Sequence, residues 1–380
     1  MGFRLLLIIL VSLVCLCAVM VISVICIKLR QARNNEKKIS DMKKIRPVLN
    51  KLFAAETINF NKNHKNCLSR LANKLEIKAS LQTLEDMLLD VLEDSEGERK
   101  ARAGIIAYYF GFPEKCLHMI RDRLTAHIAI GCRKAGLYRF ALAIPDILNT
   151  LDILSSETQL QALMALARIG DIDAMVKAFD KIHPLIFVNE RAVNEILKTF
   201  SGDRIGLYGR MIFHQSAYLV RLFLKAIDRE TANVFIEEII AISENGGKEM
   251  RLAGIIAAGK SDSKKKIPIL LRAMNDDEWE IRAMAVKTIG VVNSPRAIKL
   301  LKQAACDREW WVRQNAVTSI LEYPSCDKIL LSIIKTGDKY AYDSLLHTIE
   351  KTSRTRLLHK ITEVRMQRSR RPGRARELVW

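Results

Sequence analysis

Apolar residues along this chain recur every three or four positions, the spacing that places them on one face of an α-helix. The pattern itself repeats at a longer interval. Arg251, Arg282 and Arg313 are spaced 31 residues apart, each with an apolar residue just before it and a small residue three positions after it. A fixed period of this length is typical of stacked units that are each too small to bury their own apolar face.

Each repeat is predicted to be a helical hairpin, because residues 295–307 and 310–321 both show helical spacing. Arg191 and Arg221 extend the period backward, and residues 341–349 extend it forward. This gives about eight or nine repeats between residues 65 and 352. Stacked hairpins form a superhelix with a convex and a concave face. We therefore predict an all-α fold, a right-handed α–α superhelix of solenoid type.

Two residue types mark the expected ends of the second helix of a repeat. Asp276 and Asp307 lie just before it, where a carboxylate accepts hydrogen bonds from free N–H groups. Gly170, Gly259 and Gly290 lie where it should end, as glycine commonly does after a helix C-terminus.

The N-terminal segment has a different pattern, because Leu5 to Ile27 is 23 residues without a charge. As a helix it would reach roughly 34 Å, enough to cross a bilayer core of about 30 Å. It is longer than the apolar region of a signal peptide, and no small-x-small cleavage site follows it. Arg4 precedes the segment, whereas eight Lys and Arg residues follow it by residue 46, so the positive-inside rule places the rest of the chain in the cytoplasm.

The expected organisation is therefore a single transmembrane helix ahead of a repeat body. Residues 1–4 would be extracytoplasmic, 5–27 the anchor, 28–64 a basic juxtamembrane helix or linker, 65–352 the solenoid, and 353–380 a basic tail. Pro47 is predicted to break the juxtamembrane stretch. We expect a single-pass protein of the inner or plasma membrane.

The formal net charge of +19 is unevenly distributed along the chain. Residues 28–51 contribute +7, residues 351–380 contribute +8 and Arg4 adds +1, so residues 52–350 carry only +3. A nearly neutral repeat body does not favour nucleic-acid binding, which needs a basic surface.

No catalytic or metal-binding pattern is visible. The 8 cysteines form no CxxC pair, which indicates a reducing compartment rather than a disulfide framework or a zinc site. Cys116 and His118 are the nearest approach to a metal pair, but on a helix they would point about 200° apart. We predict no catalytic residues, no cofactor and no metal.

Residues 254–261, GIIAAGKS, match the phosphate-loop pattern GxxxxGK[ST]. Such a loop must follow a strand so that its backbone N–H groups can surround phosphates. Here the repeat register aligns Gly254 with Ala285 and Gly259 with Gly290, so we interpret the segment as a helix, with Gly254 at a helix contact.

Residues 276–321, beginning DDEWEIRAMAVKTIG, resemble HEAT-like repeats of the phycobilisome-lyase type, whose pattern is an Asp, then Val-Arg, then small residues at regular spacing and a terminal Leu/Ile-Gly. In that family the Asp and Arg of neighbouring repeats pair in a ladder. The resemblance assigns this structural role to Asp276, Asp307, Arg282 and Arg313, with Arg251 as the equivalent arginine one repeat earlier. The earlier repeats lack the Asp.

Trp279, Trp310 and Trp311 cluster in the best-formed repeats, and Trp279 and Trp310 are repeat equivalents. They are either buried at repeat junctions or part of a surface that binds a partner, since tryptophan is enriched at binding hot spots.

Two groups of basic residues are candidates for binding lipid or another anion. One follows the apolar segment and the other lies in the tail: Lys37, Lys38, Lys43, Lys44, Arg368, Arg370, Arg371 and Arg374. The alternative for the first group is that it only determines topology. The tail is a solvated basic segment, or it binds anionic lipid, an acidic membrane protein or, last, nucleic acid.

These features favour a membrane-anchored cytoplasmic scaffold that binds other, membrane-associated proteins at the inner face of a bacterial membrane. It could be an accessory subunit of a membrane enzyme or of a polysaccharide-export system. The alternatives are a solenoid enzyme of the lyase or DNA-glycosylase class, which should show a deep pocket with convergent polar groups, and a nucleic-acid-binding HEAT protein.

Overall fold

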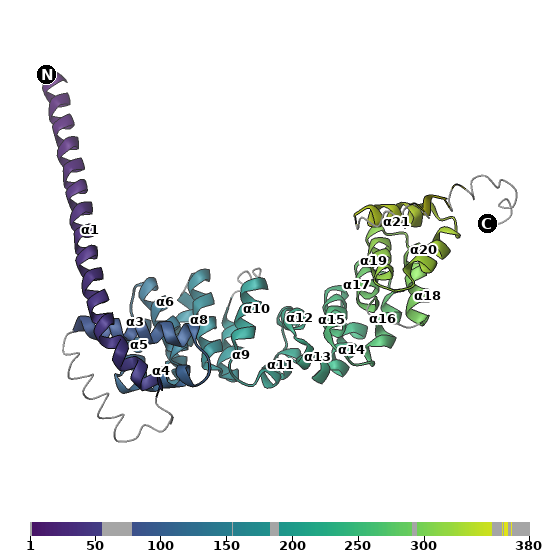
Figure 1. Ribbon diagram of the computed structural model, residues 1–380, viewed down its shortest axis with the longest axis horizontal. Coiled ribbons are helices and arrows are strands. Elements are labelled where there is room, and N and C mark those ends of the chain that lie inside the picture. Colours follow the sequence, from purple (N-terminus) through teal and green to yellow (C-terminus); the bar gives the residue numbers. More distant parts are fainter. Residues whose placement is uncertain are drawn as a thin grey trace. The chain divides into compact units, whose positions relative to one another are not determined.

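The computed structural model describes residues 2–54, 78–153, 155–182, 190–290, 295–351, 359, 361–363 and 366. These residues form helices and no strand, as the helical periodicity predicts (Figure 1). Their contacts divide the chain into two parts. The N-terminal half is residues 1–174 with 199–201, and the C-terminal half is residues 175–198 with 202–380.

The N-terminal half contains one long helix and a set of shorter ones. These are α1 (Gly2–Ala54), α3 (Lys78–Asp94), α4 (Gly97–Tyr109), α5 (Phe112–Ile120), α6 (Thr125–Leu137), η1 (Ala141–Ala143), α7 (Ile144–Thr150), η2 (Leu151–Ile153) and α8 (Ser156–Ile169). Helices α3 and α4, and α5 and α6, pack as neighbouring pairs, and α6 packs against α8. The boundary between the halves falls in α9 (Ile172–Lys181).

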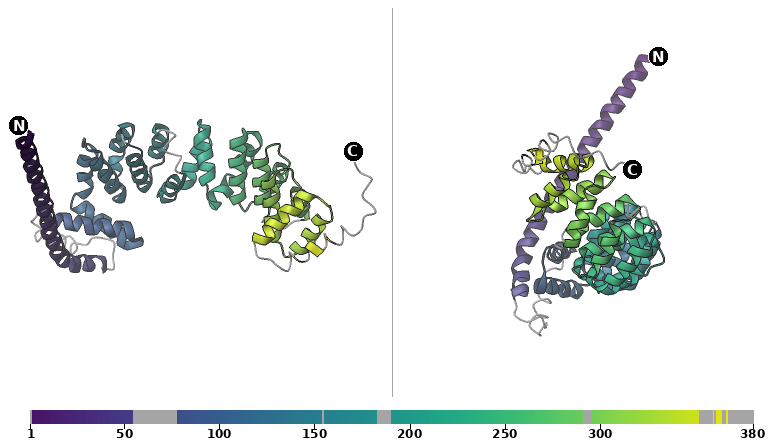
Figure 2. Two further views of the ribbon diagram at one scale, coloured as in Figure 1. Left: turned by 90° about the horizontal axis from the view of Figure 1, so that it is seen from above. Right: turned by 90° about the vertical axis from the view of Figure 1, so that its right-hand side faces the viewer.

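The C-terminal half continues with shorter helices arranged in hairpins (Figures 1 and 2). They are α10 (Glu190–Thr199), α11 (Arg204–Ile212), α12 (Ala217–Ala226), α13 (Arg229–Val234), α14 (Ile236–Asn245), α15 (Lys248–Lys260), α16 (Lys266–Ala273), α17 (Trp279–Ile289), α18 (Pro295–Ala304), α19 (Trp310–Leu321), α20 (Cys326–Ile334) and α21 (Lys339–Lys351). Each hairpin from α14/α15 to α20/α21 stacks on the next, with α15, α17, α19 and α21 in one layer and the even-numbered helices in the other.

One continuous apolar core runs through these hairpins. Small and branched residues such as Ala285, Val286, Ala316 and Val317 are fully buried in it. They lie at the same positions of successive repeats, so the 31-residue period reflects the same packing made again by each hairpin. The predicted helical-repeat solenoid is confirmed for this part of the chain.

Helix α1 runs through Pro47, so the predicted break at that residue is wrong. Ile45, Leu49 and Leu52 on either side of it are buried, and α1 contacts both α3 and α4. This packing holds the helix on both sides of Pro47. The proline itself removes only one backbone hydrogen bond, because it lacks an N–H group. The buried Arg102 of α4 donates to the carbonyl of Phe53 at 2.8 Å, satisfying the end of α1. Residues 40–54 therefore belong to the folded N-terminal half.

Among the described residues, no helix combines the length and apolar character needed to cross a bilayer. Of the uncharged segment 5–27, the side chains of residues 5–15 lie outside the described part of the chain.

The glycines predicted to end helices differ in their roles. Gly170 follows α8 in the left-handed region, at φ 86°, as expected of a helix stop. Gly259 lies inside α15, and Gly290 follows α17 at φ −56°, so neither is required for a left-handed turn. A Cβ on Gly259 would lie 2.8 Å from Cγ2 of Thr288, and one on Gly290 would lie 2.4 Å from Oγ of Ser319. Both are glycine because the next repeat approaches closely.

Candidate functional site

An arginine–aspartate ladder crosses the second helices of successive repeats. Arg251 pairs with Asp276 at 2.5 Å, and Arg282 forms two parallel bonds to Asp307, with Nε–Oδ2 2.9 Å and Nη2–Oδ1 3.0 Å. The Arg282 and Asp307 side chains are only 7% and 15% exposed. The pair is thus the planar, bidentate arrangement that suits arginine rather than lysine.

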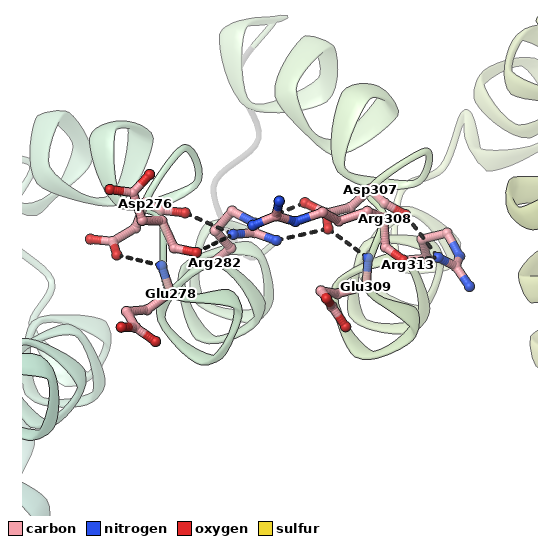
Figure 3. A network of polar contacts seen from close by, with 8 residues as sticks. Asp276, Glu278, Arg282, Asp307, Arg308, Glu309 and Arg313 are labelled. Carbon is pink, nitrogen blue, oxygen red and sulfur yellow. Dashed lines mark hydrogen bonds and ion pairs between the residues drawn. The ribbon is translucent and has the colours of Figure 1, made fainter.

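Arg282 and Arg313 also bind the turn that joins the two helices of their own hairpins (Figure 3). Nη1 of Arg282 donates to the carbonyls of Asp276 and Asp277 at 2.8 and 2.9 Å, and Nη1 of Arg313 does the same to Asp307 and Arg308. The hydrogen bond to Asp307 raises the pKa of the Arg282 guanidinium above its ordinary value, although burial acts in the opposite direction. One guanidinium therefore joins its own turn to the aspartate of the next repeat.

The aspartates do not cap the helices in the predicted way. Asp276 accepts from the backbone N–H of Glu278 at 3.0 Å, and Asp307 from that of Glu309 at 2.8 Å. Glu278 and Glu309 occupy the N-cap positions of α17 and α19, so the aspartates shape the turn before the helix instead.

The ladder ends at α21. Arg313 donates from Nε to the hydroxyl of Ser344 at 3.0 Å. Asp338 is one period beyond Asp307, but its carboxylate accepts from the N–H of Ala341 at the start of α21. In the other direction, Arg221 pairs with Glu249 at 3.0 Å, a different partner from the aspartate of the later repeats.

An aromatic surface lies beside the end of the ladder, formed by Trp310, Trp311, Tyr340 and His347. Trp310, Trp311 and Tyr340 are 38%, 55% and 65% exposed. The two tryptophan rings meet edge to face at 4.6 Å, and the Trp310 ring lies 5.8 Å from that of His347. The Arg313 guanidinium lies 5.4 Å from the centre of the Tyr340 ring, which connects the ladder to this surface.

The structure separates the three tryptophans. Trp279 is partly buried and packs against the core of the C-terminal half, whereas Trp310 and Trp311 are exposed. Tyr340 and His347 were not among the residues predicted from the sequence. Tyr340 follows Trp310 by 30 residues, close to one period, and this spacing could have identified it.

The basic candidates fall into three groups. Lys37, Lys43 and Lys44 are exposed on α1. Lys38 pairs with Asp86 of α3 at 2.5 Å, so its charge is partly neutralised within the chain. The tail residues Arg368, Arg370, Arg371 and Arg374 lie outside the described residues.

The segment that matches the phosphate-loop pattern is helical, as the repeat register predicts. Residues 254–260 lie in α15, and Ala257 is fully buried. A Cβ on Gly254 would lie 2.3 Å from Oγ of Ser243, so this glycine permits close contact with α14. Lys260 donates to the carbonyls of Lys225 and Ile227 at 2.6 and 2.9 Å, and burial lowers its pKa. No backbone N–H groups are available here to surround a phosphate.

Cys116 and His118 point in different directions on α5. Cys116 is buried and its thiol donates to the carbonyl of Phe112, whereas His118 is exposed. Burial raises the pKa of Cys116 to about 12, and that of Cys132 to about 12, so both thiols stay protonated at neutral pH. Within the described ranges, no group of three or more His, Cys, Asp and Glu side chains could hold a metal ion.

Comparison with known proteins agrees with the repeat architecture. Residues 236–322 match the family model described as HEAT repeats. The match covers α14 to α19 and contains the ladder residues Arg251, Asp276, Arg282, Asp307 and Arg313. No curated protein matches the chain.

Similar solved structures include YibA from Escherichia coli, at 14% identity and a TM-score of 0.31, covering 77% of this chain and 99% of that one. Human deoxyhypusine hydroxylase in complex with glycerol is also similar, at 13% identity and a TM-score of 0.23, covering 69% of this chain and 96% of that one. Both scores lie below 0.5, so neither similarity bears on function. On the evidence of the family match and the stacked hairpins, residues 236–322 of this chain are HEAT repeats.

Proposed function

We propose that this protein is a scaffold that binds another protein through the aromatic surface on its HEAT repeats. The observation that carries the proposal is the exposure of Trp310 and Trp311 side by side. An exposed tryptophan keeps a large apolar ring in contact with water, which is unfavourable unless a partner covers it. Paired exposed aromatic residues are therefore typical of binding hot spots. HEAT repeats generally mediate interactions between proteins, which supports this reading.

The support beneath the surface is rigid. Trp310 and Trp311 begin α19, whose Arg313 is fixed by the carbonyls of Asp307 and Arg308 and by Ser344. A preorganised surface loses little conformational entropy on binding, so more of the contact energy appears as affinity. The ladder thus acts by positioning the aromatic rings.

The proposal includes a membrane tether formed by residues 5–27. It is supported by the absence of any charge in that segment and by the basic residues that follow it, including the exposed Lys37, Lys43 and Lys44. The scaffold would then act at the inner face of the membrane on membrane-associated proteins, without catalysing a reaction itself. The finer resemblance to the phycobilisome-lyase type stays a prediction.

Replacing Trp310 and Trp311 together with alanine is expected to abolish partner binding while the protein stays folded. Hot-spot tryptophans contribute about 2 kcal/mol or more each, so the amount of partner recovered from detergent-solubilised membranes should fall at least tenfold. The unfolding temperature should change little, because both side chains are exposed.

Phe213→Ala is the matched control, since Phe213 is an aromatic residue of the same half and 71% exposed, but lies at the end of α11. Its partner recovery should equal that of the wild type. Equal recovery with the tryptophan double variant, or no specific protein recovered with the wild type, would contradict the proposed function.

A further inference from the structure

A groove in the N-terminal half lies along one face of α4 and takes no part in the aromatic surface. Its volume is about 510 Å³, within the range of sites that bind small molecules or a few side chains. Helix α4 forms the floor, and the ends of α3 and α6 form the walls. The groove lining includes Lys100, Gly104, Ile105, Tyr108 and Arg139.

The floor of the groove is open because Gly104 has no neighbour above it. A Cβ on Gly104 would meet nothing within 4 Å. Two other helical glycines are close to a neighbour: a Cβ on Gly136 would lie 2.7 Å from Cα of Ala165, and one on Gly254 2.3 Å from Oγ of Ser243. Glycine inside a helix lowers its stability relative to alanine. The packing of the chain does not account for this loss at Gly104.

Positive charge lines one side of the groove. Lys100 and Arg139 line both this groove and an adjoining cavity of about 190 Å³. Arg168 and Glu93 also line the adjoining cavity. Glu93 pairs with Arg133 and lies 3.9 Å from Arg168. The carboxylate of Glu93 is thus already shared between two arginines. The described residues that line the groove itself include Lys100 and Arg139 and no carboxylate.

Arg139 occupies a position that favours glycine. It follows α6 at φ 51°, in the left-handed region, where its N–H bonds to the carbonyl of Gly136 and that of Phe140 to the carbonyl of Ala135. This is the helix ending in which glycine is usual, because a Cβ is strained there. Arginine at this position loses stability but places a guanidinium at the edge of the groove.

We propose that this groove binds a peptide segment of a partner protein in which two apolar side chains lie next to one or two carboxylates. The apolar side chains would cover Gly104 and contact Ile105 and Tyr108, which are 37% and 45% exposed. The carboxylates would pair with Lys100 and Arg139. A single acyl chain fits less well, because a groove open along Ile105 and Tyr108 would leave much of its length in water.

Two variants separate binding from folding. Gly104→Leu places a side chain in the groove, with a Cβ that meets nothing within 4 Å, and Arg139→Gly removes the charge and relieves the left-handed strain. Both substitutions should leave the unfolding temperature equal to the wild type or a few degrees higher, because each replaces a residue that the local backbone disfavours. A variant that is more stable yet binds less tightly cannot be explained by loss of structure.

The experiment selects peptides from a random 12-residue display library on the full-length protein in detergent, then measures the affinity of the enriched peptides by fluorescence polarisation. Acidic, apolar peptides should be enriched, and Gly104→Leu and Arg139→Gly should each weaken their binding about tenfold or more. The exposed Arg123→Ala, which lies outside the groove lining, and the Trp310/Trp311 double variant should bind as the wild type does.

A parallel arm measures binding to phosphatidylglycerol vesicles. If the selection enriches no acidic peptide, if both variants bind the peptides as tightly as the wild type, or if only the vesicles respond to the two substitutions, the proposal is overturned. Because the tryptophan variant is carried alongside, failure of this groove is distinguishable from failure of the aromatic surface.

Discussion

Asp307→Ala is expected to lower the free energy of unfolding by about 3 kcal/mol, because it leaves the buried Arg282 without its carboxylate. The guanidinium of Arg282 keeps its bonds to the carbonyls of Asp276 and Asp277, which offset part of the loss. The substitution also removes the acceptor for the N–H of Glu309 at 2.8 Å. Urea denaturation followed by circular dichroism measures the change.

Asp307→Asn separates the contribution of the ion pair with Arg282 from that of the hydrogen bond with the N–H of Glu309. Asparagine can still accept from the N–H of Glu309 but no longer neutralises Arg282, so its effect should fall between those of wild type and alanine. Asp262→Ala is the matched control, since Asp262 pairs with Arg229 and both side chains are more than half exposed. Its effect should be about 0.5 kcal/mol or less. A loss for Asp307→Ala no larger than this would show that the ladder does not stabilise the repeats.

The same substitution, glycine to alanine, is expected to have opposite effects at two positions of the N-terminal half. At Gly136, the new Cβ would lie 2.7 Å from Cα of Ala165, an atom of the backbone that no rotamer change can move away. We expect Gly136→Ala to destabilise the protein by about 3 kcal/mol through overpacking of α6 against α8. This loss exceeds the gain in helix propensity of about 1 kcal/mol.

At Gly104, the new Cβ would meet nothing within 4 Å, so only the gain in helix propensity remains. Gly104→Ala should therefore stabilise the protein by about 1 kcal/mol. Thermal unfolding of the two variants beside the wild type measures both effects. Changes of the same sign would contradict the account of close packing at Gly136 and open space at Gly104.

The repeat architecture could be predicted because every hairpin makes the same packing. Arg251, Arg282 and Arg313 lie at the fourth position of α15, α17 and α19, and the buried residues that follow them share one face. The ladder at Asp276 and Asp307 could be expected only from the resemblance to HEAT-like repeats. One period after Arg313 the sequence has Ser344 in place of an arginine, and only the structure identifies this serine as a partner of Arg313.

The roles of single residues depended on neighbours distant in sequence. Pro47 continues α1 because Ile45 and Leu49 pack against other helices, which local propensity does not reveal. Gly290 looked like a helix stop, but close approach of Ser319 explains it.

The exposure of the tryptophans also lay beyond the sequence. Consecutive residues on a helix point about 100° apart, so Trp310 and Trp311 cannot both face the core, but the pattern does not say which face another repeat covers. The groove over Gly104 could not be predicted from the sequence either, because it exists only where no other helix packs against that face of α4.

The most direct test of the scaffold function is photo-crosslinking from the aromatic surface in intact cells. Benzoylphenylalanine would be placed at Trp311 and, as a control, at Phe213 of the same half, and crosslinked products identified by mass spectrometry. The proposed function predicts one specific protein crosslinked from position 311 and none from position 213. No crosslinked protein from position 311, or the same products from both positions, would contradict it.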